Sequence, residues 1–296
     1  MTAFSYATLS DLGDGKLGTR DVPCPLCGPD RRDPANRKRR VLRIWHNAHG
    51  FASCHCARCG ERGWASDGQQ EVAPTRTIRQ LRKKADDRDR DRVVRQLGKA
   101  RWLWSRRRPI ESSIAETYLR DARCYLGPFP STLGFLPPSK PGHHPAIIAA
   151  FGVPVEIEPG AIKIESERLR GVHLTMIAGD GSAQADAEKT KLMVGPSSGW
   201  PIVLAPMSDL LGLAIVEGIE TGLSIYEATG LGVWVAGSAG RMPALAEKIP
   251  DQVDCVSIIG EDDQAGRAGV VGLAKLLTAR GLYCETRFLD GEERAA

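Results

Sequence analysis

The pattern of hydrophobic and polar positions is most regular near the C-terminus, where short apolar runs alternate with segments of helical period. We expect strands at residues 213–216, 231–235, 255–259 and 283–288, and helices at 221–228, 243–248 and 265–280. Because strands and helices alternate, they should form a parallel sheet with right-handed crossovers. This part of the chain is therefore predicted to have an α/β fold with a Rossmann-like sheet.

The middle of the chain has a less regular pattern. A helical period over residues 92–119 is broken at Pro109, which interrupts a helix. Residues 120–211 are rich in proline and glycine and contain two β-like runs, 146–151 and 171–177. These features favour an α+β subdomain ahead of the C-terminal sheet.

Overall composition is that of an ordinary globular protein, with 42% hydrophobic and 26% charged residues in a chain of 296. No apolar run reaches the length of about 18 residues that a membrane span requires. The first 21 residues carry Asp11, Asp14 and Asp21 and have no apolar run, so we expect no signal peptide. A cytoplasmic location is the corresponding expectation.

Five of the eight cysteines lie within one short region, and four of them form two C-x2-C pairs separated by 28 residues. The paired residues are Cys24, Cys27, Cys56 and Cys59. A C-x2-C turn delivers two thiolates from one tight loop, and zinc binds four such ligands in a tetrahedron. Residues 41–45 and 51–55, between the pairs, should form a β-hairpin. The pattern predicts a small all-β zinc ribbon.

Cys54 leaves an alternative ligand set open. It would replace Cys56 if the register shifted, although its spacing to Cys59 is not that of a C-x2-C turn. Histidines that could substitute as ligands are His46, His49 and His55, each more typical of an ordinary loop or strand residue. The scattered cysteines, expected to be buried as small apolar side chains, are Cys124, Cys255 and Cys284.

Charge is distributed unevenly along the chain, although the net charge is only +4. Residues 1–108 hold 25 Lys/Arg and 12 Asp/Glu, a net +13, whereas residues 109–296 hold 15 and 24, a net −9. A basic front end suits a polyanion, and an acidic rear end could hold metal ions. Solvated surface charge is the alternative interpretation.

Basic and aromatic residues are interleaved around the predicted ribbon. The candidates for contact with single-stranded DNA are Arg39, Arg40, Arg43 and Trp45. Cations bind phosphates and flat rings stack on bases, so this mixture is typical of single-strand binding. Alternatively, the aromatic residues fill the core of a very small domain.

Acidic residues follow two of the predicted strands. Glu217 comes directly after strand 213–216, and the run Glu261, Asp262 and Asp263 follows strand 255–259. Ligands bind beyond the carboxyl ends of parallel strands, so both clusters should share one sheet edge. A set of oxygen ligands there would suit Mg²⁺ and phosphoryl chemistry. Taken singly, Glu217 could instead cap the next helix, and the second cluster could be an exposed turn.

These two acidic segments resemble the signatures of the Toprim domain. The segments are Val-Glu217-Gly-Ile-Glu and Gly-Glu261-Asp-Asp263-Gln-Ala-Gly266. The family occurs in bacterial-type primases, type IA and II topoisomerases, certain nucleases and recombination proteins. The resemblance implies a catalytic Mg²⁺ or Mn²⁺ held by Glu217, Glu261 and Asp263, with Asp262 assisting. The family pattern usually has aspartate at both motif acids, whereas this chain has the longer Glu261 first.

The resemblance extends to segments ahead of the acidic clusters. Residues 171–181 and 189–196 look like the lysine-bearing stretch that precedes Toprim in bacterial-type and phage or plasmid primases. It implies contacts to nucleotide phosphates or template from Lys189, Lys191 and His173. Residues 116–120 and 133–137 are similar to the helical lead-in of mobile-element Toprim proteins.

The order of ribbon, lead-in and Toprim resembles that of a DNA primase, which makes RNA primers on single-stranded DNA from nucleoside triphosphates. No G-x-x-x-x-G-K-[ST] stretch occurs, so a replicative helicase would be a separate chain. The alternatives are a Toprim nuclease and a DNA-binding accessory protein without turnover. A third acidic patch at 290–293 is a weaker candidate for metal-facing residues.

Four segments summarise this organisation. We expect a zinc ribbon at residues 1–65, a charged linker at 66–95, the α+β primase-core subdomain at 96–208 and the Toprim domain at 209–296.

Overall fold

The computed structural model describes residues 2–30, 34–48, 50–68, 75–207 and 211–289. The chain divides into two compact units, Met1–Ala85 and Asp86–Ala296. The boundaries expected at residues 65, 95 and 208 stay predictions. No helix within the described ranges is long and apolar enough to cross a membrane. His49 and the acidic patch at 290–293 lie outside these ranges.

The first unit is built on a four-stranded antiparallel sheet in the order β1-β2-β3-β4. Its strands are β1 (Gly18–Pro23), β2 (Arg40–His46), β3 (Phe51–Cys56) and β4 (Arg62–Ser66), and its helices are α1 (Tyr6–Leu12) and α2 (Pro34–Arg37). The predicted hairpin is confirmed as β2 and β3. One further strand pairs on each side, and two short helices accompany the small sheet.

This sheet buries one face and exposes the other. In β2, Leu42 and Ile44 are buried, whereas Arg43 and Trp45 point the opposite way and remain exposed. Successive side chains of a strand alternate between its two faces, which explains this pattern. Leu9 of α1 packs in the same core as the buried β2 residues. The unit therefore has a buried apolar inner face under α1 and a solvent-exposed outer face.

Helix α3 (Thr75–Ser105) crosses the boundary between the two units. Nearly all its side chains from 83 to 99 are exposed, because this stretch consists largely of charged residues. Near the C-terminal end, Ala100 and Trp104 are buried in a core cluster of the second unit. The segment expected to be a linker or an exposed helix start is helical from residue 75.

The second unit contains a nine-stranded sheet in the order β10-β9-β6-β11-β13-β12-β14-β15, with β5 also pairing β6. These strands are β5 (Leu133–Leu136), β6 (Ala146–Phe151), β9 (Gly171–Met176), β10 (Lys191–Val194), β11 (Ile202–Ala205), β12 (Gly212–Val216), β13 (Gly232–Val235), β14 (Cys255–Glu261) and β15 (Tyr283–Leu289). A separate hairpin joins β7 (Val155–Glu158) and β8 (Ala161–Lys163).

Parallel and antiparallel pairings divide this sheet into two parts. The β13-β12-β14-β15 pairs are parallel, as predicted for the C-terminal α/β region. The remaining pairs are antiparallel, and Ile202 of β11 opposite Val235 of β13 joins the two parts. The predicted fold classes are confirmed, and the α+β and α/β regions share one continuous sheet.

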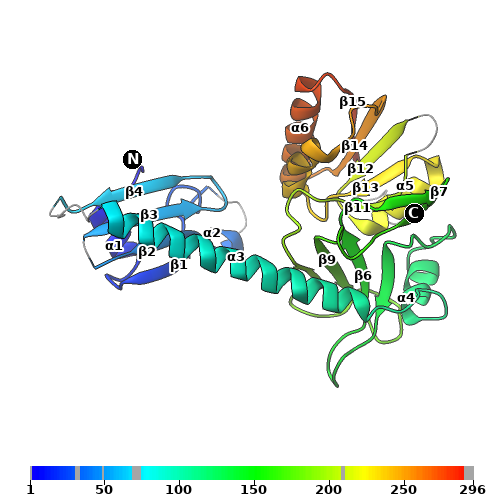
Figure 1. The fold of residues 1–296 in the computed structure, drawn as a ribbon, viewed down its shortest axis with the longest axis horizontal. Coiled ribbons are helices and arrows are strands. Elements are labelled where there is room, and N and C mark those ends of the chain that lie inside the picture. The colour runs from blue at the N-terminus through cyan, green and yellow to red at the C-terminus, as the bar shows by residue number, and fades with distance from the viewer. Residues whose placement is uncertain (1, 31–33, 49, 69–74, 208–210, 290–296) are drawn as a thin grey trace. The chain divides into compact units, whose positions relative to one another are not determined.

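Helices cover both faces of the parallel strands (Figure 1). Val216 packs with α5 (Ile219–Thr229) in one core cluster, whereas Ile215 packs with α6 (Gln264–Ala279) and the 3₁₀-helix η2 (Ala239–Lys248) in another. The alternation of neighbouring strand residues between two apolar layers explains why these strands are apolar throughout.

Three local features differ from expectation. The helix expected at 243–248 begins at Ala239 and is 3₁₀ rather than α, with Pro243 inside it; proline has no N–H to donate and disfavours an α-helix interior. The residues after Pro109, which were expected to resume one helix, form the short α4 (Ile114–Thr117) followed by the π-helix η1 (Tyr118–Ala122). The predicted burial of Cys124 is wrong, because it occupies an exposed turn with φ 53°.

Gly266 allows α6 to begin directly against the end of β14. A Cβ at this position would lie 2.1 Å from the backbone oxygen of Glu261. Gly98, on the exposed side of α3, has nothing within 4 Å of a Cβ built there.

Replacing these glycines by alanine should have opposite effects on stability. We expect Gly266→Ala to lower the free energy of unfolding by about 1–3 kcal/mol, because α6 must shift away from β14. Gly98→Ala should raise it by about 0.5–1 kcal/mol through helix propensity. Denaturant titration of both variants checks this, and a Gly266→Ala protein as stable as the parent would contradict the close approach.

Candidate functional site

Four cysteine thiols of the first unit converge on one point. Cys24 and Cys27 follow β1, while Cys56 ends β3 and Cys59 precedes β4. Their sulfur atoms all lie within 4.8 Å of one another. Sγ–Sγ distances are 3.9 Å for Cys24–Cys59 and 3.8 Å for Cys27–Cys56. A tetrahedron with Zn–S bonds of about 2.3 Å has edges of about 3.8 Å, so this group fits a structural zinc ion.

The two cysteine turns are closed by equivalent backbone hydrogen bonds. The N–H of Gly28 donates to the carbonyl of Cys24 at 2.8 Å, and the N–H of Gly60 donates to that of Cys56 at 3.0 Å. Burial alone would raise the pKa of the Cys56 thiol, but backbone N–H groups in its turn help lower it to about 7. Burial raises the pKa of Cys24 and raises that of Cys27 to about 12, so of these three thiols Cys56 ionises most readily before any metal binds.

Among the described residues, the alternative ligands lie away from this group. Cys54 is buried in the core, and its Sγ lies 3.5 Å from the Thr2 hydroxyl. The Nε2 atom of His46 is 2.8 Å from the Tyr6 hydroxyl. His55 is exposed on the outer face of β3. The structure therefore brings together the four cysteines with C-x2-C spacing.

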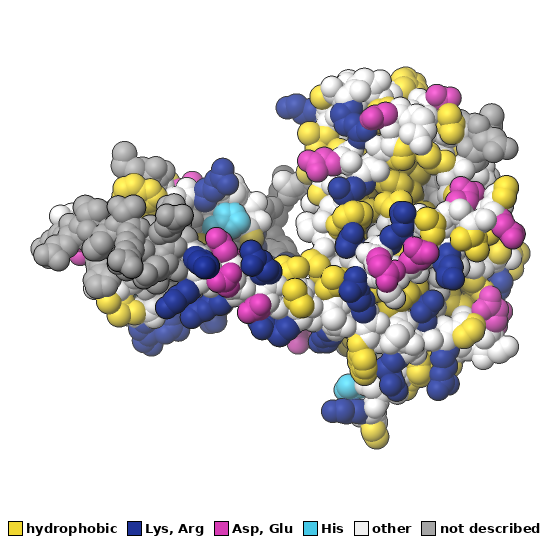
Figure 2. Space-filling model, in the orientation of Figure 1, with side chains coloured by type: hydrophobic (Ala, Val, Ile, Leu, Met, Phe, Trp, Pro, Cys, Tyr) yellow, Lys and Arg dark blue, Asp and Glu magenta, His cyan; other side chains and the backbone are white. Residues whose placement is uncertain are grey.

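The predicted DNA-binding residues of this unit are all exposed. Arg39 and Arg40 lie at the start of β2, and Trp45 is 42% exposed. Arg43 makes a two-pronged ion pair with Asp21, with both N–O distances 2.7 Å. Asp21 lies on the adjacent strand β1, directly opposite Arg43, and the sequence did not predict this ion pair. Figure 2 shows Lys and Arg side chains gathered on the visible face of this unit.

Aromatic side chains form a row across the outer face of the same sheet. Trp45 is paired in register with Ser53, which is paired in turn with Trp64. Both tryptophans are exposed, and Trp64 stacks with Phe51 at a centroid distance of 5.7 Å. These rings are therefore not filling the domain core, which was the alternative interpretation for them.

In the second unit, the acidic residues lie at one edge of the parallel sheet. β12 and β14 are adjacent, with Val216 opposite Ile259. Glu217 follows β12 directly, and Glu261 is the last residue of β14. The prediction that both acidic clusters follow the carboxyl ends of strands at one edge is thus confirmed as topology.

Glu217 is half-buried and surrounded by like charge. Burial raises the pKa of its carboxyl group, and the charges of Glu261 and Asp263 raise it further. A hydrogen bond from the Ala239 N–H and the charge of Lys191 act in the opposite direction without cancelling the rise. A divalent cation bound here would favour the ionised form of Glu217.

The other acidic residues make local structural contacts. Asp263 is the N-cap of α6 and accepts a hydrogen bond from the Gly266 N–H at 2.7 Å. Asp262 forms an ion pair with Arg267. Among the described residues, the cysteines alone form a tight group of three or more potential metal ligands. The roles expected for Glu217, Glu261, Asp262 and Asp263 in holding Mg²⁺ therefore stay predictions.

The residues expected to contact nucleotide lie in different environments. Lys189 is in an exposed bend, whereas Lys191 begins β10. His173 of β9 is only 3% exposed, and its ring meets Phe151 edge-on at 6.3 Å. Burial lowers the pKa of His173 to about 4, with further lowering by Lys191 and Arg241. Near neutral pH its imidazole is therefore uncharged.

Glu220 is a polar residue of this region that the sequence interpretation left without a role. It lies in the first turn of α5, three residues after Glu217, and its side chain is 18% exposed. One carboxylate oxygen lies 3.8 Å from the Lys191 ammonium. The sequence signal was its place in the Toprim-like segment, but sequence alone does not show which carboxylate is buried.

Replacing a cysteine of the metal group should release zinc, whereas replacing its neighbour Cys54 should not. We expect Cys56→Ser to lose bound zinc and the fold of the first unit, since zinc contributes about 10–16 kcal/mol in small zinc domains. Cys54→Ser, two residues earlier on the same strand face, should keep one zinc per chain. Elemental analysis with circular dichroism measures this, and zinc loss in Cys54→Ser alone would contradict the assignment.

His173 should make the protein less stable at acidic pH. Its folded pKa of about 4 lies below the unfolded value of about 6.5. The stability it contributes is therefore complete above pH 6.5 and is lost as the pH falls toward 4. Between pH 7 and pH 5 this loss is roughly 2 kcal/mol. Unfolding of His173→Gln should show a correspondingly smaller pH dependence, and identical pH dependence would contradict the burial.

Comparison with family models assigns two segments of the second unit. Residues 94–204 match a domain of unknown function (DUF7146), and residues 212–293 match the Toprim domain. No curated protein matches the chain.

Three solved structures resemble the chain at low identity. A DNA primase domain from Pseudomonas aeruginosa is 12% identical, with a TM-score of 0.35, and the match covers 62% of this chain and 54% of that one. The zinc binding and RNA polymerase domains of Aquifex aeolicus primase are 15% identical, with a TM-score of 0.37, and the match covers 97% of this chain and 78% of that one. The primase fragment of the bacteriophage T7 primase-helicase protein is 12% identical, with a TM-score of 0.36, and the match covers 90% of this chain and 88% of that one. The first match spans about half of the Pseudomonas domain. Because these TM-scores are low, the three structures carry no argument about the function of this chain.

The Toprim match begins at β12 and includes both acidic segments. It therefore covers the strands whose carboxyl ends carry Glu217 and Glu261, at one edge of a parallel sheet with helices on both faces. Residues 212–293 of this chain thus match the Toprim domain, and their described part has the parallel sheet edge that carries both acidic segments.

Proposed function

We propose that this protein is a DNA primase that synthesises short RNA primers on single-stranded DNA by metal-dependent nucleotidyl transfer. The observation that carries the proposal is the position of Lys191 3.8 Å from Glu220, in the first turn of the helix that starts two residues after Glu217. Lys191 reaches this point although it belongs to β10, at the far end of the same sheet. A cation for nucleotide phosphates thus accompanies a carboxylate set suited to a divalent metal ion.

The acidic edge supports a site for Mg²⁺ or Mn²⁺. Glu217, Glu261 and Asp263 offer only oxygen ligands, the type that these hard cations prefer. Burial, followed by the charges of Glu261 and Asp263, raises the pKa of Glu217. A bound cation would favour the ionised form of Glu217 and neutralise charge developing on the reacting phosphate.

Each residue would have a distinct task in nucleotidyl transfer. Glu217, Glu261 and Asp263 would hold the metal, and Asp262 would assist once free of Arg267. Lys189 and Lys191 would bind phosphate oxygens as positive charges. His173, buried and neutral, would act by hydrogen bonding to nucleotide or template rather than through charge.

The first unit would bind the template strand. Arg39, Arg40 and Arg43 would contact phosphates, and exposed Trp45 would stack on a base. Zinc at the four cysteines would stabilise this unit rather than take part in the reaction. The protein would use nucleoside triphosphates as substrates and work with a replicative helicase on a separate chain.

A priming assay tests the proposal. The full chain, single-stranded DNA templates and nucleoside triphosphates should yield short primers only when Mg²⁺ or Mn²⁺ is present. Glu217→Gln should reduce the yield at least about 100-fold by removing a metal ligand. Glu217→Gln should not lower the free energy of unfolding, because the substitution removes a negative charge that lies close to other negative charges. Exposed Glu247→Gln is the matched control and should behave as the parent.

Other outcomes would identify a different activity. Cleavage of nucleic acid without nucleotide dependence would favour the Toprim nuclease. DNA binding with neither primers nor cleavage would favour the accessory protein. Primer synthesis unaffected by Glu217→Gln would contradict the proposed metal site.

A further inference from the structure

Glu220 lies at the centre of a polar network that is largely closed to solvent. Its Oε1 atom accepts hydrogen bonds from the Tyr118 hydroxyl at 3.2 Å and from the Gln184 amide at 3.1 Å. Its Oε2 atom lies 3.8 Å from the Lys191 ammonium. Three separate segments thus supply partners to one carboxylate, and all three belong to the region that precedes the Toprim domain.

The network keeps Glu220 ionised despite its burial. Burial opposes ionisation, yet Lys191, Arg123 and Tyr118 contribute to a net lowering of the Glu220 pKa. Arg123 acts partly through Tyr118, because its Nε donates to the Tyr118 hydroxyl at 2.9 Å. Placing a charged carboxylate inside a protein is costly unless it has partners of this kind. A buried charge with several partners is more typical of a functional site than of simple packing.

Lys191 is the network member that also influences the acidic edge. Its side chain is 44% exposed, so the ammonium remains available to a ligand. Its ammonium lies 3.8 Å from Glu220, three residues after Glu217, and its charge opposes the rise in the pKa of Glu217. A lysine has four flexible side-chain bonds, and fixing them costs up to about 2 kcal/mol. An anchoring carboxylate reduces the freedom that a ligand must otherwise remove.

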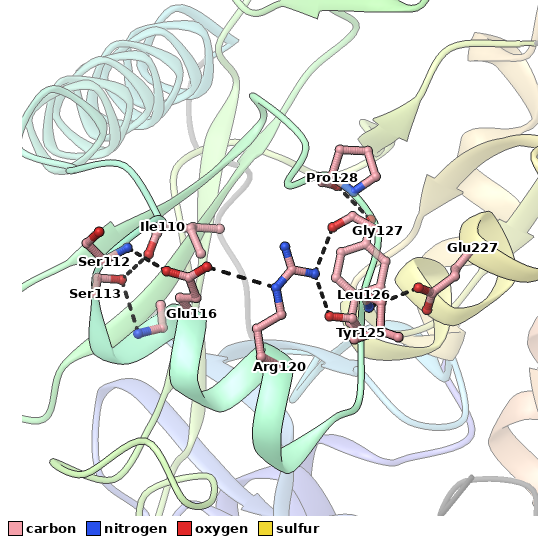
Figure 3. Close-up of polar contacts among 11 residues, drawn as sticks. Ile110, Ser112, Ser113, Glu116, Arg120, Tyr125, Leu126, Gly127, Pro128 and Glu227 are labelled. Atoms are coloured by element: carbon pink, nitrogen blue, oxygen red, sulfur yellow. Dashed lines mark hydrogen bonds and ion pairs between the residues drawn. The ribbon is translucent and has the colours of Figure 1, made fainter.

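A second glutamate on the same helix offers a comparison. Glu227 lies seven residues after Glu220, two turns along the same side of α5, and accepts a hydrogen bond from the Leu126 N–H at 2.9 Å. Arg120 holds that loop through the carbonyls of Tyr125 and Gly127, at 2.6 and 2.9 Å (Figure 3). Glu227 thus attaches the same preceding segment to α5 through a backbone N–H group.

We propose that Glu220 is a positioning residue that holds Lys191 at the carboxylate edge, ready for the phosphate groups of a nucleoside triphosphate. The inference rests on the proposed function, and it assigns Glu220 no contact with the nucleotide. Tyr118 and Gln184 orient Glu220 from one side, while Glu220 orients Lys191 on the other. The Toprim domain and the segment before it then build the nucleotide site jointly.

A double-mutant cycle on nucleotide binding tests this proposal. Binding of ATP with Mg²⁺, without template, is measured by calorimetry for the parent, Glu220→Gln, Lys191→Met and the double variant. We expect each single variant to weaken binding about tenfold and the double variant to be no weaker than Lys191→Met alone. Lys191→Arg should bind ATP within about threefold of the parent only while Glu220 is present.

The matched control is Glu227→Gln, which changes a glutamate of the same helix that faces the same preceding segment. Its ATP affinity should stay within about twofold of the parent, because the glutamine oxygen can still accept from Leu126. If Glu220 merely stabilised the fold, Glu220→Gln would lower stability while leaving ATP affinity unchanged, which would overturn the proposal. Additive effects of the two substitutions on ATP affinity would overturn it too.

Failure of the proposed function is distinguishable from failure of this inference. If the parent chain binds no ATP and makes no primers, the proposed function is wrong. Denaturant unfolding of the same four proteins then measures the coupling between Glu220 and Lys191, because this experiment needs no ligand. Non-additive unfolding free energies would show that Glu220 still positions Lys191, whereas additive ones would show that it does not. Should Glu220→Gln not fold, Glu220→Asp, which shortens the side chain, takes its place in both cycles.

Discussion

The parallel pairing of β12 with β14 is the constraint on which the candidate active site depends. It places Glu217 next to the strand that ends in Glu261. Burial of Glu217, followed by the negative charges of Glu261 and Asp263, raises the pKa of its carboxyl group. Such repulsion destabilises the folded chain by itself, and it is tolerated because the flanking layers of α5 and α6 hold both strands in place. A divalent cation would relieve this repulsion, and the relief would add to the free energy of its binding.

The continuous sheet explains how a positive group reaches this edge. β11 pairs antiparallel with β13, so the strands preceding the Toprim domain extend its sheet instead of forming a separate layer. Lys191 on β10 can then approach the loop after β12 on the face covered by α5. Glu220, in the first turn of α5, meets Lys191 there. Cation and carboxylates thus come from two segments that match different family models.

The first unit depends on a different interaction. Its apolar core is small, and four thiols converge beside it with the spacing of a zinc tetrahedron. Small domains with limited cores commonly need a metal or disulfides for stability. With the inner face occupied by core and ligands, the outer face of the sheet is left for Trp45 and Trp64. Arg43 on that face is already paired with Asp21, so it must exchange partners to bind phosphate.

Local patterns in the sequence were sufficient for the elements of the C-terminal α/β region and for the cysteine group. Short apolar runs mark β12 and β14, which are covered on both faces, and apolar positions at helical period mark α5 and α6, which bury one side. The C-x2-C spacing identifies the four ligands, since each turn is local. Only the tertiary structure decided which charges meet. Tyr118 and Glu220 are 102 positions apart, and Glu220 is bound to Lys191 rather than exposed on its helix. Such pairs depend on strand order and helix packing, which no short stretch of sequence encodes.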